Sequence, residues 1–229
     1  MRTRIQDTMA QLKAKYREAL KDEAMQTAFD ELWATWSSEM GAMIYSEVLS
    51  TLDLLLLIGL LGAIGIGSGL WHTLPRSWTL LADVLPITLL INLFLLSFGR
   101  RVLALGWWEL AGLWAGYQAA AFGAVVALGP EALNGSAGYL PALAFLGLFW
   151  LWLRARRHPM ALSTAAAALL FAVSLTLRTE DLALCPALPI GTHFLWHLLN
   201  ALLLYLLLDA LIRHGMPREE RGAPTPHAL

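Results

Sequence analysis

Two histidines stand four residues apart near the C-terminus of the chain, in the stretch GTHFLWHLLN at residues 191–200. Residues with this spacing lie on one face of a helix, one turn apart. His193 and His197 can therefore each direct a ring nitrogen to one point about 2.0–2.1 Å away, the usual zinc–nitrogen distance. The pair alone is a weak indication of a metal, because histidines near a helix end also form ordinary hydrogen bonds.

A second polar group occurs much earlier, in the stretch GSGLWHTLPRSWTLLADVLPI. Ser68 and His72 are again four residues apart, and Asp83 follows eleven residues later. If His72 joins the two later histidines, three protein ligands leave one position open, as in catalytic zinc sites. Zinc lowers the pKa of bound water from 15.7 to about 7. Asp83 could then act as the general base and Ser68 could hydrogen-bond an oxyanion.

The composition identifies the environment of these residues. Of 229 residues, 58% are hydrophobic and 14% are charged, which is far more apolar than a soluble protein. The net charge of −1 gives no electrostatic basis for nucleic-acid binding. A single cysteine, Cys185, excludes an internal disulfide and a cysteine-based metal cluster. The first forty residues lack the apolar core and cleavage site of a signal peptide. We therefore predict a multi-pass membrane protein.

Six apolar segments each approach the roughly 20 residues that a spanning helix needs. They run over about Leu54–Leu70, Thr79–Phe98, Leu110–Leu128, Gly138–Leu153, Met160–Leu177 and Ile190–Leu208. The sequence therefore predicts an all-α transmembrane helical bundle of six spans over residues 51–213, with a degenerate seventh span as a possible addition.

Residues 1–50 form a predicted N-terminal arm of different character. Apolar residues recur at helical spacing between residues 5 and 20 among lysines, arginines and glutamates, which indicates an amphipathic helix on a membrane surface or against a partner. Residues 26–48 mix tryptophans and methionines with four acidic residues, and we interpret them as an interfacial helix, a poor seventh span being the alternative. The arm would suit contacts in a homo-oligomer. Residues 214–229, with three prolines, are predicted to be a disordered cytoplasmic tail.

Lysine and arginine positions set the expected orientation. With six spans, 14 of the 16 basic residues share one side with both termini, whereas the other side keeps Arg76 and Arg178. This distribution predicts that both termini are cytoplasmic, in a cell membrane and more narrowly a bacterial inner membrane. The same topology brings the polar groups of the two stretches to a similar depth near the extracytoplasmic face.

Each polar residue also has an ordinary interpretation. His72 and Asp83 alone could be a structural pair that closes the loop between two spans. Ser68 alone could be a small packing residue, since GIGIGS-type runs let helices approach closely. Ionisable groups inside a membrane are costly and usually mark function, so their occurrence together at one depth favours a metal site.

The pattern of these five residues resembles that of a known family. Ser68-x3-His72, Asp83 eleven residues on, and His193-x3-His197 in the last span are similar to the motif of the alkaline ceramidases. The wider superfamily of membrane hydrolases includes the progestin and adipoQ receptors and the Per1-type lipid-remodelling proteins. The wording of both stretches resembles bacterial ceramidase-like members, and the resemblance covers about residues 54–210.

The resemblance implies zinc on the three histidines, with Asp83 handling the water and Ser68 the oxyanion. It implies hydrolysis of a membrane lipid amide, such as the N-acyl bond of ceramide, to a fatty acid and a sphingoid base. The alternative is a non-catalytic receptor or structural protein that keeps a structural zinc. The family usually has seven spans and an acidic calcium motif, DWCExN, before the first. Residues 29–39, FDELWATWSSE, do not match this motif, so calcium is not an expected cofactor.

Other polar residues allow two interpretations each. Arg178 and Asp181 could line the entrance to the site or orient a head group, but we expect a clamp that holds the loop before the last span. Asn200 could support a metal-binding histidine or form an interhelix hydrogen bond. A b-type haem is disfavoured, because ligands one turn apart on one helix face cannot reach opposite sides of a haem.

Overall fold

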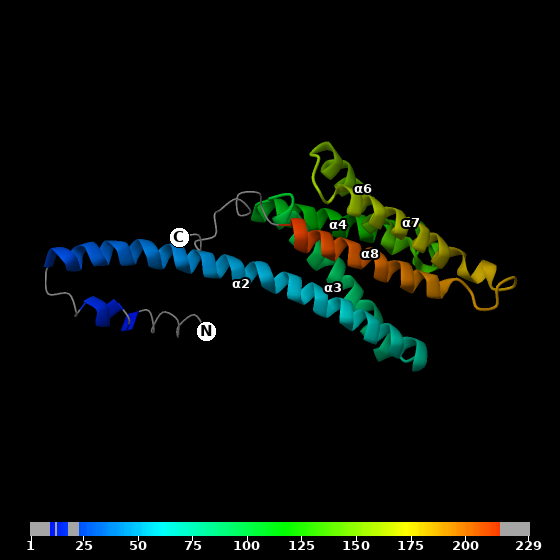
Figure 1. Ribbon diagram of the computed structural model, residues 1–229. Coiled ribbons are helices and arrows are strands. Elements are labelled where there is room, and N and C mark those ends of the chain that lie inside the picture. The colour runs from blue at the N-terminus through cyan, green and yellow to red at the C-terminus, as the bar shows by residue number, and fades with distance from the viewer. Residues whose placement is uncertain (1–9, 12, 18–22, 216–229) are drawn as a thin grey trace. The chain divides into compact units, whose positions relative to one another are not determined.

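A computed structural model describes residues 10–11, 13–17 and 23–215, and all secondary structure in this part of the chain is helical. The elements are α2 (Glu23–Thr73), α3 (Ser77–Arg101), α4 (Trp107–Leu128), α5 (Ala132–Gly135), the short 3₁₀ helix η1 (Ala137–Tyr139), α6 (Leu140–Ala155), α7 (Ala161–Leu184) and α8 (His193–His214) (Figure 1). The chain divides into two compact units, Met1–Leu52 and Asp53–Leu229. The predicted all-α class is confirmed.

Six helical segments among the described residues are long and apolar enough to span a membrane. They are Thr51–Thr73, Ser77–Arg101, Trp107–Leu128, Ala137–Ala155, Ala161–Leu184 and His193–His214. At 1.5 Å per residue their lengths are about 28–38 Å, close to the roughly 30 Å hydrocarbon thickness of a bilayer. The prediction of a multi-pass bundle with six spans is therefore confirmed.

In the N-terminal unit, residues 10–11 and 13–17 are helical and α2 begins at Glu23. The side chains of Lys13 and Arg17 lie 2.9 and 3.0 Å from the Asp30 carboxylate. The hydrogen bond from Lys13, together with the positive charges of both bases, holds the pKa of Asp30 below its ordinary value. Most of the predicted helix over residues 5–20 lies outside the described residues. The predicted disordered tail was 214–229, but His214 ends α8, and residues 216–229 lie outside the described residues.

Residues 26–48, which we predicted to be an interfacial helix, are helical in the structure. They belong to α2, which continues without interruption for 51 residues into the first span. The first proline of the chain is Pro75, so no residue between Glu23 and Thr73 removes a backbone hydrogen-bond donor from the helix. Polarity changes along this segment, but nothing in it ends the helix.

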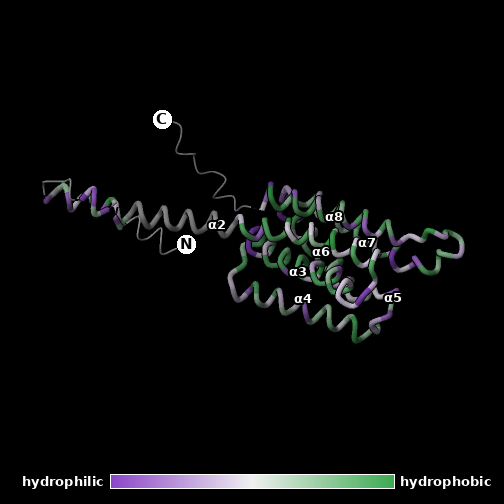
Figure 2. Tube along the Cα trace, turned by 90° about the horizontal axis from the view of Figure 1, so that it is seen from below, coloured by the Kyte–Doolittle hydropathy of each residue, from purple (hydrophilic) through white to green (hydrophobic). Residues whose placement is uncertain are grey.

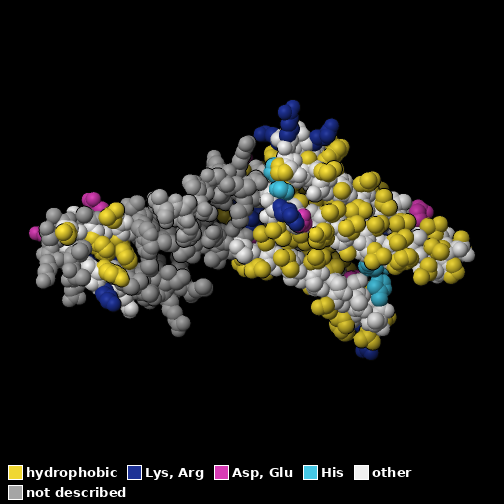
Figure 3. Space-filling model, in the orientation of Figure 1, with side chains coloured by type: hydrophobic (Ala, Val, Ile, Leu, Met, Phe, Trp, Pro, Cys, Tyr) yellow, Lys and Arg dark blue, Asp and Glu magenta, His cyan; other side chains and the backbone are white. Residues whose placement is uncertain are grey.

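The core of the membrane unit is a set of aromatic and aliphatic side chains between the helices. Phe98 of α3 stacks on Phe149 of α6 with ring centroids 4.4 Å apart, and Leu153, Met160 and Leu211 are fully buried. Many other leucines are exposed. Figure 2 shows that hydrophobic residues recur along the helices of the membrane unit, and in Figure 3 apolar side chains cover much of the surface of this unit. Such a surface suits lipid contact and would be unfavourable in water.

Helices α2 and α3 approach each other closely at Gly67 and Ala82. Gly67 is buried, and a Cβ atom added there would overlap the backbone carbonyl of Ala82. Only a glycine therefore permits this approach of the two backbones. The next residues along the two helices are Ser68 and Asp83, so the contact places both polar side chains beside each other.

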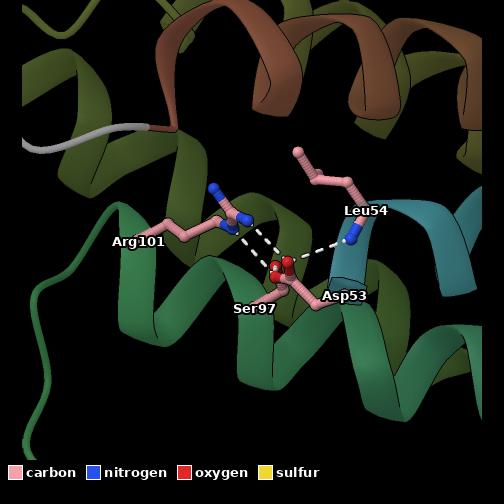
Figure 4. Close-up of polar contacts among 4 residues, drawn as sticks. All are labelled: Asp53, Leu54, Ser97 and Arg101. Atoms are coloured by element: carbon pink, nitrogen blue, oxygen red, sulfur yellow. Dashed lines mark hydrogen bonds and ion pairs between the residues drawn. The ribbon is translucent and has the colours of Figure 1, made fainter. Parts of the chain in front are cut away.

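An ion pair joins the other ends of the same two helices (Figure 4). Arg101 donates two hydrogen bonds, of 2.8 and 2.5 Å, to the Asp53 carboxylate. Ser97 donates a third, and the backbone N–H of Leu54 donates a fourth at 2.9 Å. The Arg101 side chain is only 8% exposed and that of Asp53 is 23% exposed. We call these four residues the Asp53 cluster.

Candidate metal centre

Three histidine side chains from two helices meet at the opposite end of the membrane unit from the Asp53 cluster. His72 lies in the last turn of α2, and His193 and His197 lie in the first two turns of α8. One nitrogen from each ring lies within 4.8 Å of those of the other two. The ring centroids are 4.9–5.5 Å apart. The structure thus brings His72 to the later pair, as the sequence predicted.

The spacing of the ring nitrogens suits a tetrahedral metal ion. The Nε2 atoms of His72 and His197 are 3.2 Å apart. Two ligands at about 2.0–2.1 Å from zinc would be separated by about 3.3–3.4 Å along a tetrahedral edge. His72 is exposed and both others are half-buried, so a fourth position is accessible. The three side chains fit zinc by donor type, number and spacing.

Ser68 contacts the ring of His197. Its hydroxyl oxygen lies 3.4 Å from Nδ1 of His197, while Nε2 of the same ring faces His72. A hydrogen-bonding group at the second ring nitrogen fixes the orientation and tautomer of a metal-binding histidine. Ser68 is therefore placed to hold the ring of His197, a role that the sequence did not indicate, as well as to meet a substrate oxygen.

Asp83 lies in the second turn of α3, beside the histidines and partly buried. It lines the same end of the cavity as Ser68, His72 and His197. Among the described residues, no lysine or arginine forms an ion pair with it within 4 Å. The carboxylate is therefore near the histidines and has no ion-pair partner in the described part of the chain.

Asp181 positions the start of α8. Its Oδ1 atom accepts hydrogen bonds from the backbone N–H groups of Thr192 and His193, at 2.5 and 2.9 Å. Gly191 adopts the left-handed conformation (φ 67°), and a Cβ atom there would crowd the carboxylate. A carboxylate at the N-terminus of a helix satisfies free N–H groups and interacts favourably with the helix dipole. Asp181 thus fixes the backbone that carries His193.

The expected clamp between Arg178 and Asp181 does not form. Asp181 points to α8, whereas the Arg178 guanidinium lies over the rings of Tyr139 and Trp196, 5.6 and 5.1 Å from their centroids. The two residues were expected to pair because they lie three apart in the segment that was predicted to be the loop before the last span. The free N–H groups at the start of α8 are the stronger partners for the carboxylate.

An apolar cavity of about 500 Å³ opens beside the histidines. Ser68, His72, Asp83 and His197 line its polar end. The rest of the wall is formed by aromatic and aliphatic side chains, among them Phe94, Phe145, Phe149, Phe171, Leu203 and Leu207. The volume lies within the range of small-molecule sites. The cavity offers room for a hydrocarbon chain whose polar end would lie at the histidines.

Three residues that line the cavity were either not predicted from the sequence or do not form the contact that was considered for them. Tyr139 and Trp196 line the cavity and were not singled out, because aromatic residues are common throughout the spans. The feature that distinguishes these two rings is their contact with the Arg178 guanidinium. The sequence does not reveal this contact, because it does not show which helices are neighbours. Asn200 also lines the cavity, and no hydrogen bond joins it to a histidine among the described residues.

No protein-family model matches this chain, and no curated protein or solved structure matches it.

Proposed function

We propose that this chain is a zinc-dependent membrane hydrolase that cleaves a lipid amide, such as the N-acyl bond of a ceramide-like lipid. The observation that supports it most is the meeting of His72, His193 and His197 at the polar end of an apolar cavity. Asp83 and Ser68 complete the set of groups that hydrolysis needs. The family resemblance of the motif points to the same chemistry.

Each group has a separate role in the proposed reaction, according to its position in the site. Zinc, when bound by the three histidines, supplies a Lewis acid and lowers the pKa of a water molecule. Asp83 accepts the proton of the attacking water and returns it to the leaving amine. The apolar wall holds the acyl chain and excludes bulk water. Ser68 orients His197 through Nδ1 and is within reach of the substrate's carbonyl oxygen.

We also propose the setting of this reaction. The distribution of lysines and arginines favours a cell membrane with both termini in the cytoplasm. The histidine end of the bundle would then lie near the extracytoplasmic face. A lipid would enter the cavity from the bilayer, because the surrounding surface is apolar.

Hydrolysis by the zinc-loaded protein in detergent tests the proposal. A ceramide with a fluorescent acyl chain should be cleaved, and Asp83→Asn should lower the rate about 10²- to 10⁴-fold while zinc stays bound. Asp209→Asn, at an exposed carboxylate that pairs with Arg213, is the matched control and should keep the rate. If both proteins bind zinc and neither cleaves any N-acyl lipid, the zinc is structural and the receptor or structural interpretation is correct.

A further inference from the structure

A positive side chain without a carboxylate partner lies beside the candidate metal centre. Arg178 of α7 is half-buried, and its guanidinium lies over the rings of Tyr139 and Trp196. Its Nε donates a hydrogen bond of 3.2 Å to the hydroxyl of Ser136, which is fully buried. Among the described residues, no aspartate or glutamate lies within 4 Å of the guanidinium. Neutral groups alone therefore hold this charge in place.

Such an arrangement is unusual inside a membrane bundle. Ionisable side chains there are costly and generally pair with one another. Arg101, at the other end of the bundle, follows this rule and binds Asp53. The aromatic rings offset part of the cost for Arg178, because a guanidinium over an aromatic face is attracted by it. Its remaining hydrogen-bonding capacity is free to meet a ligand.

Arg178 is adjacent to two residues that line the cavity, although it is not itself a lining residue. It interacts electrostatically with Asp83, His193 and His197. Tyr139 and Trp196, the two rings under its guanidinium, line the cavity. A ligand whose hydrocarbon chain fills the apolar part would therefore bring its head group into the range of this charge.

The charges at this end do not balance when a divalent ion is bound. Three neutral histidines leave the two charges of the ion unchanged, and Arg178 adds a third. Asp83 and Asp181, which accepts a hydrogen bond from the backbone N–H of His193, supply two negative charges, so one positive charge remains. A ligand with its own negative group next to the reacting carbonyl would reduce the excess, in surroundings where charge interactions are strong.

Building on the proposed function, we propose that Arg178 is a specificity-determining residue that selects N-acyl amino acids as substrates. In these lipids a carboxylate is separated by one carbon from the amide nitrogen. Arginine recognises carboxylates through two parallel hydrogen bonds. In the reaction, water gives its hydroxyl to the acyl carbon and a proton to the nitrogen as the C–N bond breaks. The products are a fatty acid and an amino acid.

Binding of two matched ligands tests this proposal. N-dodecanoylglycine carries the carboxylate, and N-dodecanoylglycinamide differs from it only by a neutral amide. Their dissociation constants would be measured by calorimetry on zinc-loaded Asp83→Asn protein, in which hydrolysis is slow. We expect about 10- to 100-fold tighter binding of the carboxylate, as for a hydrogen bond to a charged group. Arg178→Gln should abolish this preference and leave the affinity for the glycinamide unchanged.

Arg178→Lys keeps the positive charge, and it provides a second test of the proposal if Arg178→Gln does not fold. It should retain part of the preference. The proposal would be overturned if the two ligands bound the arginine-containing protein with equal affinity. It would also be overturned if Arg178→Gln lowered the affinity for both ligands equally. Arg178 would then be a support for the aromatic rings.

Hydrolysis of the same two ligands by protein with Asp83 intact separates this proposal from the proposed function. Cleavage of both at equal efficiency would overturn the specificity role and leave the hydrolase standing. Carboxylate-selective binding without cleavage of either would overturn the hydrolase and leave Arg178 as part of an anion-binding site.

Discussion

The two ends of the membrane unit each hold a polar cluster. One lies between α2 and α3 and the other between α2, α3 and α8, and the two clusters differ in how completely their polar groups are paired. In the Asp53 cluster, one carboxylate accepts hydrogen bonds from Arg101, Ser97 and the Leu54 backbone. At the histidine end, three rings face one another, and Asp83 and Arg178 have no ion pair within 4 Å among the described residues.

This difference separates a structural cluster from a functional one. A complete set of partners leaves nothing for a ligand to add, so the Asp53 cluster can only hold α2 against α3. Among the described residues, the histidine end leaves Asp83 and Arg178 without an ion pair within 4 Å, and it opens to a cavity. A charged group without a partner is unfavourable in an apolar environment. A bound metal ion and substrate would supply the missing partners.

The largest effect on stability should come from breaking the Asp53 cluster. Asp53→Ala leaves the Arg101 guanidinium, which is 8% exposed, without its partner. Loss of one member of such a pair costs about 3–5 kcal/mol of unfolding free energy. Unfolding in detergent by a denaturant series would measure it, and bound zinc should remain stoichiometric in the folded fraction.

The control for this variant is Asp209→Ala. Asp209 pairs with Arg213 at 2.7 Å, but the two side chains are 36% and 66% exposed. An exposed pair one helical turn apart contributes about 0.3–0.5 kcal/mol. Equal destabilisation by the two substitutions would show that the Asp53 cluster does not hold the helices together.

A smaller effect, confined to the histidine end, is expected for Asp181→Ala. The substitution removes the acceptor for the Thr192 and His193 backbone N–H groups. Supporting contacts of this kind change metal affinity by about 10- to 100-fold. Competition with a zinc chelator would measure the affinity. Glu180→Ala, at the exposed neighbouring position, should leave it unchanged. An unchanged affinity in Asp181→Ala would mean that α8 positions its histidines without this cap.

Gly67→Ala should destabilise the contact between α2 and α3. The added methyl group would overlap the Ala82 carbonyl oxygen and must push the two backbones apart. We expect a cost of about 3 kcal/mol, at the upper end of the usual range for overpacking. Gly69→Ala is the control, because its added methyl group meets nothing within 4 Å and alanine favours a helix. If the Gly67→Ala protein were as stable as the Gly69→Ala protein, the close approach of the two helices at Gly67 would be contradicted.

The sequence predicted those features that depend on spacing within one helix. Six apolar runs gave the spans, and two i, i+4 pairs together with the topology gave His72, His193 and His197 as one group. It did not predict contacts that depend on which helices are neighbours. Asp53 was not singled out, because its partner Arg101 lies 48 residues away. The continuation of α2 was missed because a change of polarity was interpreted as a change of structure.

The assignment of Arg178 and Asp181 failed for a related reason. Each residue had an attractive partner close in sequence, so a local pair was the simplest interpretation. In the structure each meets a group from another element, the start of α8 in one case and Tyr139 with Trp196 in the other. These partners are defined only by tertiary packing.

Zinc content is the measurement that tests the central claim most directly. The detergent-purified protein would be compared by elemental analysis with a His193→Ala/His197→Ala double variant. We predict about one zinc per chain in the unchanged protein and none in the variant, with the helical content of both the same. Absence of zinc from the unchanged protein after incubation with the metal, or its retention in the variant, would contradict the metal centre and the hydrolase mechanism built on it.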